Sequence, residues 1–301
     1  MTERNLLITG GTGFIGQDLC PALIRKGYQL TVLSRKTESE VRALCGRVTA
    51  ISALTDIPAD QTFSGVINLA GEGIADKRWT EARKKALRDS RIALSRELVT
   101  VLLSRETLPQ VVISGSAVGY YGAQGSEPVN ENTVPHDEFA HQLCRDWEQA
   151  VSPLASKGVR LCLSRTGLVV GANGGFLERM ALPFKLGLGG RIGSGHQYMP
   201  WVHRDDVVGA IIWMLENTQT SGPYNVVSPA PVTNREFTST LGKVLRRPVL
   251  FPVPEVILRL ALGEMSDLLL TGQRAVPEKL LAEGYQFVWP ELEPALKQAL
   301  R

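Results

Sequence analysis

Residues 6–16 read Leu-Leu-Ile-Thr-Gly-Gly-Thr-Gly-Phe-Ile-Gly, and this stretch decides the fold. A short apolar run ends at Thr9, and glycines follow at positions 10, 13 and 16. Between a strand and a helix this spacing suits a dinucleotide. The first glycine permits a tight turn, the second lets a pyrophosphate approach the backbone, and the third packs the helix against the strand. The helix expected from Phe14 to Lys26 would direct its free amides at the phosphates.

The rest of the first half alternates apolar runs with helical patterns. We expect strands over 29–34, 65–70, 110–114 and 159–164, and helices over 81–104 and 138–154. Strands rich in Val, Ile and Leu that alternate with helices favour a parallel sheet covered on both faces. Because such crossovers are right-handed, the sequence predicts a doubly wound α/β Rossmann sheet.

The composition changes after about residue 167. Residues 171–195 are rich in glycine, and helical patterns follow at 205–217, 234–245, 254–270 and 278–281. Irregular segments beside a nucleotide-binding sheet usually build the substrate side of a cleft. We therefore expect a dinucleotide-binding domain over 1–166 and a smaller mixed substrate-side region over 167–301, from which the chain can cross back to the sheet.

The end of the second expected strand indicates which cofactor binds. NAD-binding versions of this motif carry an Asp or Glu there for the ribose hydroxyls, whereas this chain has Ser34, Arg35 and Lys36. A carboxylate would repel a 2′-phosphate, and an arginine fork with a serine hydroxyl would bind it. The other interpretation of the basic pair is a solvated loop end. The position favours NADP(H).

Composition excludes several classes of protein. The 301 residues are 21% charged and 44% hydrophobic, and 33 basic against 30 acidic residues give a net charge of +3. This balance argues against a nucleic-acid or anionic-lipid partner. No apolar run reaches the ~18 residues of a membrane span, and no signal-peptide pattern begins the chain, so we expect a cytoplasmic protein. The four cysteines lack metal-ligand spacing, and we expect no metal site.

Several further motifs carry a resemblance to a known family. Residues 9–16 match its glycine-rich turn, 68–71 (Asn-Leu-Ala-Gly) the loop after its fourth strand, and 114–122 (Ser-Gly-Ser-Ala-Val-Gly-Tyr-Tyr-Gly) its serine segment. The chain resembles the extended, sugar-nucleotide-epimerase-like branch of the short-chain dehydrogenase/reductase superfamily. Residues 187–196 and 270–277 resemble one atypical subgroup, the epimerase-family proteins, whose C-terminal signature segment corresponds to 252–300.

The resemblance implies where the cofactor lies. It places the pyrophosphate at the turn, the 2′-phosphate at Ser34 and Arg35, the adenosine beside Leu69 and Ala70, and the nicotinamide half near Val169. Arg91 would reach back to the phosphates from the following helix, or it is an ordinary helix-surface cation. The cofactor residues predicted in this way are Gly10, Thr12, Gly13, Phe14, Ile15, Gly16, Ser34, Arg35, Leu69, Ala70, Arg91 and Val169.

The resemblance fails at the catalytic pair. Typical members carry a Tyr and a Lys four residues apart on one helix face, where the Lys lowers the Tyr pKa. In the corresponding stretch this chain has Phe139 and Leu143, and neither transfers a proton. The remaining catalytic candidates are Ser116, as a hydrogen-bond donor to a substrate carbonyl, and Tyr120, as an acid without a neighbouring cation. For Tyr121 we expect a wall of the cleft.

The four histidines receive different interpretations. His136 and His141 suit a solvated helix start, and His203 suits a structural contact at the start of a later helix. His196 lies in the glycine-rich segment and is the candidate for a substrate contact or an acid/base group. Two functions remain open: an NADP(H)-dependent, epimerase-like oxidoreductase of an unknown small molecule, and a non-catalytic NADP(H)-binding sensor or regulatory protein.

Overall fold

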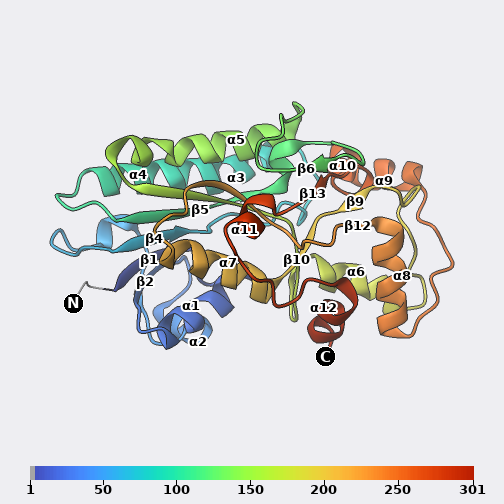
Figure 1. Cartoon of the computed structure of the whole chain (residues 1–301), viewed down its shortest axis with the longest axis horizontal. Coiled ribbons are helices and arrows are strands. Elements are labelled where there is room, and N and C mark those ends of the chain that lie inside the picture. Colours follow the sequence, from blue (N-terminus) through green and yellow to red (C-terminus); the bar gives the residue numbers. More distant parts are fainter. Residues whose placement is uncertain (1–3) are drawn as a thin grey trace.

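A seven-stranded sheet, parallel throughout, forms the centre of the computed structural model, which describes residues 4–301 (Figure 1). Its strand order is β3-β2-β1-β4-β5-β7-β11, and every neighbouring pair is parallel. The doubly wound sheet is thus confirmed. Its strands are β1 (Asn5–Thr9), β2 (Gln29–Leu33), β3 (Thr49–Ile51), β4 (Gly65–Asn68), β5 (Val111–Ala117), β7 (Arg160–Thr166) and β11 (Gly222–Val226).

Helices cover both faces of this sheet, as Figure 1 shows. One layer holds α1, α2 and α7, and the opposite layer holds α3, α4 and α5. A π-helical turn, Asp89–Ala93, joins α3 to α4, so the helix expected over 81–104 is nearly continuous. The bounds are α1 (Gly16–Arg25), α2 (Glu38–Cys45), α3 (Glu81–Arg88), α4 (Leu94–Leu103), α5 (Phe139–Val151) and α7 (Arg204–Glu216).

Alternation along β1 explains how one sheet fills two cores. Leu6 and Ile8 point into the layer of α1 and α7, where they pack with Leu19 and Ile211. Leu7 points the other way and belongs to a separate cluster with helix α4. All of these side chains are fully buried. Successive strand residues face opposite sides of a sheet, so an uninterrupted apolar run is what a doubly covered strand requires.

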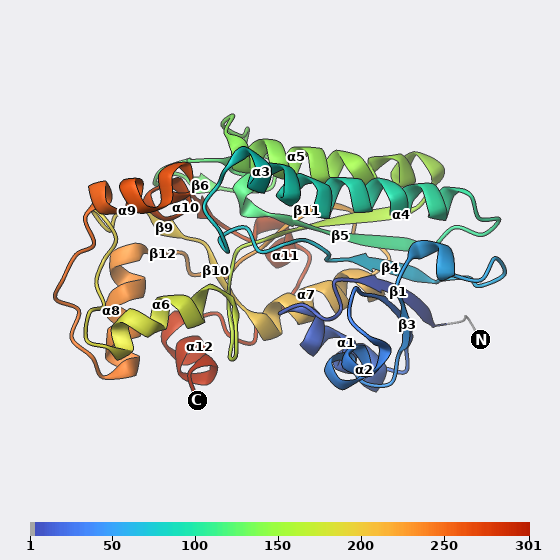
Figure 2. The ribbon, with the colours of Figure 1, turned by 180° about the vertical axis from the view of Figure 1, so that it is seen from behind.

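The second half of the chain builds a lobe beside the carboxyl ends of the strands (Figure 2). Here α6 (Gly175–Lys185), α8 (Asn234–Leu245) and α12 (Leu292–Ala299) enclose a cluster around Trp201 and Phe237. The lobe also contains α9 (Glu255–Leu262), α10 (Asp267–Leu270), α11 (Glu278–Ala282) and short strands: β8 (Leu168–Val170) with β10 (Trp201–His203), β9 (Tyr198–Met199) with β12 (Val232–Thr233), and β13 (Arg274–Ala275) with β6 (Pro128–Val129). No helix within residues 4–301 has the length and apolarity to cross a membrane.

The chain does cross back to the sheet after residue 167. Helix α7 packs beneath the central strands, and β11 adds the edge strand beside β7. Leu280 and Tyr285, from the C-terminal segment, also belong to the core cluster of β1 and α1. Residues 167–301 therefore contribute to the central sheet and its core as well as to the lobe.

Candidate functional site

The glycine-rich turn has a different geometric requirement at each glycine. Gly10 has φ +74°, and a Cβ there would lie 2.7 Å from the Leu69 carbonyl oxygen. At Gly16 a Cβ would collide with the carbonyls of Gly10 and Gly11. A Cβ at Gly13 would meet the Gly10 oxygen at 3.1 Å and no other described atom within 4 Å. One side of Gly13 is therefore open, as a pyrophosphate cradle requires.

Side-chain hydrogen bonds hold the ends of β1, β4 and β5 together behind this turn. The Thr9 hydroxyl donates to Asn68 Oδ1 at 2.6 Å and accepts the Ala70 amide at 3.2 Å. The Asn68 amide donates to Ser95 Oγ and Ser114 Oγ. These buried bonds fix the loop that carries Leu69 and Ala70, so both residues lie directly beside Gly10.

At the end of β2, hydroxyls and a free guanidinium lie next to the turn. Thr12 Oγ1 and Ser34 Oγ are 3.3 Å apart, and Ser34 Oγ accepts the Lys36 amide. Arg35 is exposed, and its guanidinium has no hydrogen bond or ion pair among residues 4–301. A guanidinium with all five donors available and two hydroxyls close to a helix start form a suitable site for a phosphate.

Phe14 connects the turn to the second lobe. Its ring fills the space beside Gly171, Gly174 and Gly175, where added Cβ atoms would lie about 3 Å from it. Arg204 lies over the ring, with its central carbon 4.6 Å from the centroid, and it pairs with Asp18 of α1. The glycine-rich segment is therefore closed onto the turn by an aromatic ring. No motif in the sequence indicated this use of Arg204.

The environments of the remaining predicted cofactor residues differ. Ile15 and Val169 are partly buried against the central core. Arg91 is not the helix-surface cation of one interpretation: it donates to the Glu72 carbonyl at 2.7 Å and lies 5.3 Å from the Trp147 ring. Burial lowers its pKa. It supports the loop after β4 at Gly71, and its contact with phosphate stays a prediction.

A buried ion pair lies at the ends of β5 and β7. Arg165 donates two hydrogen bonds to the Glu148 carboxylate, each 2.9 Å, and a third at 3.0 Å to the Tyr121 hydroxyl. Ser116 Oγ donates to Glu148 at 2.6 Å. The single hydroxyl proton of Ser116 is thus directed at Glu148. Ser116 donates to a substrate carbonyl only if it gives up this bond.

The two adjacent tyrosines have opposite environments. Tyr121 is fully buried and donates to Asn225 at 2.7 Å, so the expectation that it forms a cleft wall is wrong. Burial raises the pKa of Tyr121 to about 12. Tyr120 is partly exposed, and its hydroxyl has no partner among the described residues. The Arg165 guanidinium lies 3.5 Å from the Tyr120 ring centroid, so a cation is present where the sequence predicted none.

Two stripes of α5 face β5 and the turn after it, and the predicted pair lies on the stripe whose Trp147 contacts Gly115. Phe139 packs edge-on against Trp79 at 4.8 Å, and Leu143 is buried in the same apolar cluster with α3. The residues that approach Gly119, after β5, are Ala140 and Cys144, at 3.4 and 3.8 Å from its added Cβ. Burial raises the pKa of Cys144 to about 12. Neither the predicted pair nor this one is a Tyr and a Lys.

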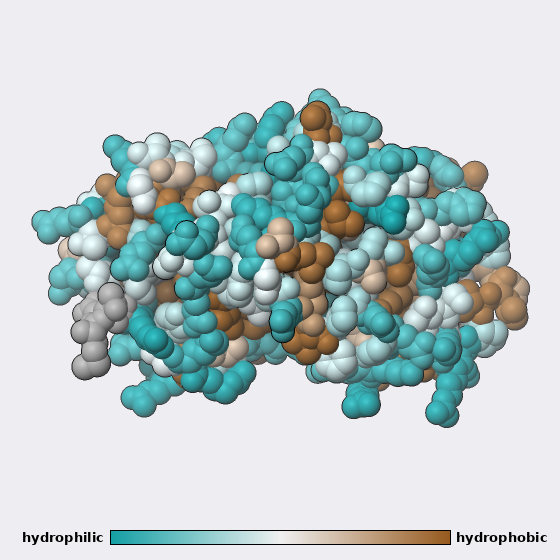
Figure 3. All heavy atoms as spheres, viewed as in Figure 1, coloured by the Kyte–Doolittle hydropathy of each residue, from teal (hydrophilic) through white to brown (hydrophobic). Residues whose placement is uncertain are grey.

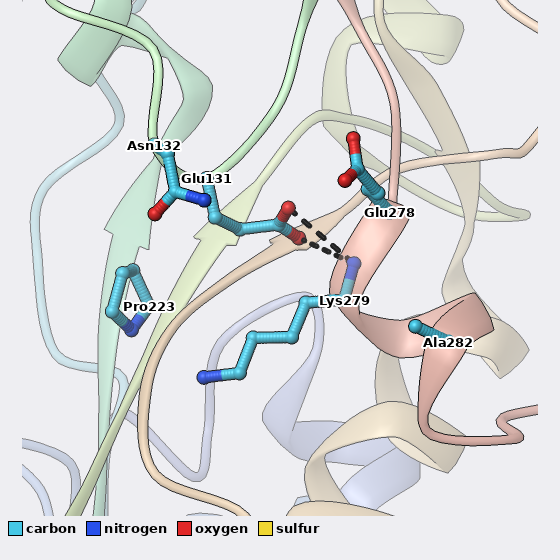
Figure 4. Close-up of a pocket in the computed structure, with 6 residues that line it drawn as sticks. All are labelled: Glu131, Asn132, Pro223, Glu278, Lys279 and Ala282. Atoms are coloured by element: carbon cyan, nitrogen blue, oxygen red, sulfur yellow. Dashed lines mark hydrogen bonds between the residues drawn. The ribbon is translucent and has the colours of Figure 1, made fainter.

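A cavity of about 340 Å³ lies elsewhere, between the loop after β6, strand β11 and helix α11 (Figure 4). The Glu131 carboxylate accepts a hydrogen bond from the backbone amide of Lys279, as the dashed lines in Figure 4 show. It also accepts one from the backbone amide of Asn225 at 3.0 Å. Burial raises the pKa of Glu131. No predicted site residue lines this cavity. Because Glu131 holds three segments together through backbone amides, its role there is structural.

Comparisons with known proteins decide the family. The model of the NAD dependent epimerase/dehydratase family matches residues 6–227. The chain belongs to this family. A domain of unknown function, DUF1731, matches residues 253–299, which confirms the C-terminal signature segment expected at 252–300. The predicted resemblance to an atypical epimerase-family subgroup is thereby confirmed.

Relatives extend along nearly the whole chain. Epimerase family protein YfhF of Bacillus subtilis is 37% identical over 302 residues, with 98% of each chain covered. A crystal structure of human epimerase family protein SDR39U1 with NADPH superimposes with TM-score 0.89 at 34% identity, again over 98% of each chain. A nucleoside-diphosphate sugar epimerase from Corynebacterium glutamicum has TM-score 0.80 and 26% identity; it covers 99% of this chain and 58% of its own.

Within this family framework the histidines contribute little to the predicted site. His203 accepts the Asp205 amide at the start of α7 and bonds Gln298, so its structural role is confirmed. His136 is exposed, but His141 is buried with Nδ1 2.6 Å from the Tyr120 carbonyl, which corrects the expected solvated position. His196 is exposed in the loop before β9, and its substrate role stays a prediction. No cluster of three metal-binding side chains occurs within residues 4–301.

Sequence reasoning missed Glu148 and Arg165, which hold the catalytic candidates in place. They lie 17 positions apart, on a helix and on a strand. A signal was available for Arg165, which directly follows the mostly apolar run at 159–164, but not for Glu148, whose neighbours include Arg145 and Asp146. A charge buried in such a stretch needs an opposite charge as its partner.

Proposed function

We propose that this chain binds NADP(H) at the turn after β1 and acts as an epimerase-like oxidoreductase on a small molecule. The observation that carries the proposal is the open side of Gly13, in a turn whose Thr12 meets Ser34 next to Arg35, a guanidinium without a partner among residues 4–301. The turn amides would hold the pyrophosphate. Arg35, Ser34 and Thr12 would hold the 2′-phosphate. The presence of NADPH in the human relative's crystal structure supports the same cofactor here.

Cofactor preference is tested by replacing Arg35. Charge-assisted hydrogen bonds contribute about 1.5–3 kcal/mol each, so Arg35→Gln should weaken NADPH binding at least about tenfold. NADH affinity should stay the same, because NADH has no 2′-phosphate. Arg47→Gln is the matched control, since Arg47 is also exposed and without a partner among the described residues. Calorimetry that gives the native protein equal affinities for NADPH and NADH would contradict the proposal.

The chemistry assigned to the site is carbonyl reduction. When bound, NADPH supplies the hydride that reaches the substrate's carbonyl carbon. Tyr120 is the proton donor in our proposal: its hydroxyl gives a proton to the carbonyl oxygen, and the product is an alcohol. Two observations support it. The Tyr120 hydroxyl is free of partners among residues 4–301, and Arg165 lies over its ring, where a positive charge stabilises a developing phenolate.

A non-catalytic NADP(H)-binding sensor is the second candidate. The observation that favours it is the scarcity of proton donors: the Ser116 proton is directed at Glu148, and α5 presents Ala140 and Cys144 toward Gly119. In such a protein the cofactor site would report the NADPH/NADP⁺ ratio through binding alone. A catalytically inactive protein with full NADPH affinity is what this candidate predicts.

One experiment separates the two functions. NADPH consumption is followed for the native protein and Tyr120→Phe with a panel of aldehydes and ketones. For an oxidoreductase, loss of a general acid should slow turnover by roughly 10²-fold or more while NADPH affinity is unchanged. Tyr28→Phe is the control, because Tyr28 also has an arginine over its ring. A native protein that binds NADPH and consumes none of it would establish the sensor.

A further inference from the structure

A second pocket, of about 370 Å³, lies in the C-terminal lobe. One wall is helix α8, and the others are two extended segments around Ile192 and Val253, which pair in parallel. The Gly193 amide donates to the Val253 carbonyl at 2.9 Å, and Asn234 Oδ1 accepts the Ile192 amide at 2.8 Å. Backbone hydrogen bonds therefore fix the pocket's shape, and its volume lies in the range of small-molecule sites.

Two arginines line this pocket side by side. Arg191 and Arg235 both lie against Gly195, whose added Cβ would be 3.4 Å and 3.3 Å from their Cβ atoms. Neither guanidinium makes a hydrogen bond or an ion pair with the described residues. Because both side chains start beside Gly195 and line the same pocket, one anion bound there can accept from both guanidiniums.

No acidic side chain among the described lining residues supplies such an anion. The nearest acidic neighbour along α8, Glu236, accepts the Thr233 amide at 2.7 Å and the Thr233 hydroxyl at 2.8 Å, as the helix cap. Ser239 adds an exposed hydroxyl without a partner among residues 4–301. The cationic end of the pocket therefore offers donors for an external anion.

The other end of the pocket is apolar. Val249, Leu250 and Pro252 line it, and the Leu250 side chain is 67% exposed. Figure 3 shows hydrophobic side chains at this end of the molecule, where Figure 1 places the segment between α8 and α9. A ligand with one anionic group and one apolar group would cover the exposed leucine and neutralise the arginines at once.

We propose that this pocket binds a small organic anion: a phosphate monoester or a carboxylate on a short apolar chain. The pocket shares no residue with the glycine-rich turn or with the end of β2, so binding does not depend on NADP(H). This proposal can therefore be tested independently of the proposed oxidoreductase activity.

Calorimetry with the full chain at low ionic strength tests it. Hexyl phosphate, hexanoate and inorganic phosphate are titrated in turn, and we expect saturable binding of one of the first two. The tighter ligand identifies the anionic group. Inorganic phosphate should bind at least tenfold more weakly than hexyl phosphate, because it lacks the chain that covers Leu250. NADPH binding is measured on every variant.

Substitutions assign the binding to the pocket. Arg191→Gln and Arg235→Gln should each weaken the preferred ligand at least tenfold and leave NADPH affinity unchanged. Arg247→Gln is the matched control: Arg247 is exposed after the same helix and does not line the pocket. The proposal is overturned if neither organic anion binds saturably, if Arg247→Gln weakens binding equally, or if inorganic phosphate binds as tightly as hexyl phosphate.

Discussion

At the residue scale, the three glycines of the turn are required for different physical reasons. Gly10 needs a positive φ and a close approach to the loop after β4. Gly16 must lack a side chain because two carbonyl oxygens of the turn occupy the space where a Cβ would lie. Gly13 needs neither, because its φ is ordinary and its surroundings are open. The absence of a side chain at Gly13 keeps open the space that the pyrophosphate would occupy. Substitutions at these positions should therefore separate folding from cofactor binding.

Gly13→Val should fold and lose measurable NADPH binding, since its side chain would occupy the phosphate cradle. Gly16→Ala should instead destabilise the fold, because a Cβ would overlap two backbone oxygens that cannot move aside. Circular dichroism and urea unfolding measure whether each variant folds, and calorimetry measures its NADPH affinity. A folded Gly13→Val variant with native NADPH affinity would mean that the pyrophosphate lies elsewhere.

At the element scale, the Arg165–Glu148 pair connects β7 to α5 beneath Tyr120. Both side chains are at least nine-tenths buried. Breaking a buried pair leaves an uncompensated charge, so Glu148→Ala should lower the free energy of unfolding by about 3–5 kcal/mol. Glu148→Leu combined with Arg165→Met removes both charges and should recover much of this loss. Urea unfolding measures both variants, and a double variant no more stable than Glu148→Ala would contradict the argument.

The contact between α8 and α12 should depend on pH. Lys243 of α8 and Lys297 of α12 both pair with Glu293 and lower its pKa to about 2. A lowered folded-state pKa adds stability above the ordinary value of 4.5, and this stability is lost as the pH falls toward 2. Glu293→Gln should therefore lose less stability than the native protein between pH 5 and 2. Glu291→Gln, an exposed neighbour without a side-chain partner among the described residues, should behave like the native protein.

The elements also show what a sequence can predict. The five expected strands and the helix at 234–245 are confirmed, because their apolar period matches the surface that they bury. Helix α2 was missed although Thr37 and Glu40 form a capping box, since the helix is short and mostly exposed. Which stripe of α5 meets the cofactor stays a prediction, because a one-residue shift rotates a helix by about 100° and tertiary packing decides the orientation.

At the scale of the whole molecule, the C-terminal segment is part of the central core. The buried carboxylate of Asp206, in α7, accepts the amides of Val288 and Trp289 at 2.6 and 3.0 Å. The Tyr285 hydroxyl donates to the Asp206 carbonyl at 2.9 Å. Leu280 is fully buried in the cluster of β1 and α1. The family match ends at residue 227, yet the sheet beneath it is covered by residues that follow.

Removal of residues 278–301 should therefore abolish NADPH binding, although no predicted cofactor residue lies in this segment. The deletion exposes the apolar surface under Leu280 and leaves the Asp206 carboxylate without its two amide donors, and buried acceptors without donors are costly. We expect the shortened chain to lose its cooperative urea transition and its NADPH affinity together. Deletion of the exposed Arg301 alone is the control and should change neither. A shortened chain with native circular dichroism and native NADPH affinity would show that residues 4–277 fold independently, and the C-terminal segment would then be an attachment to the dinucleotide-binding fold.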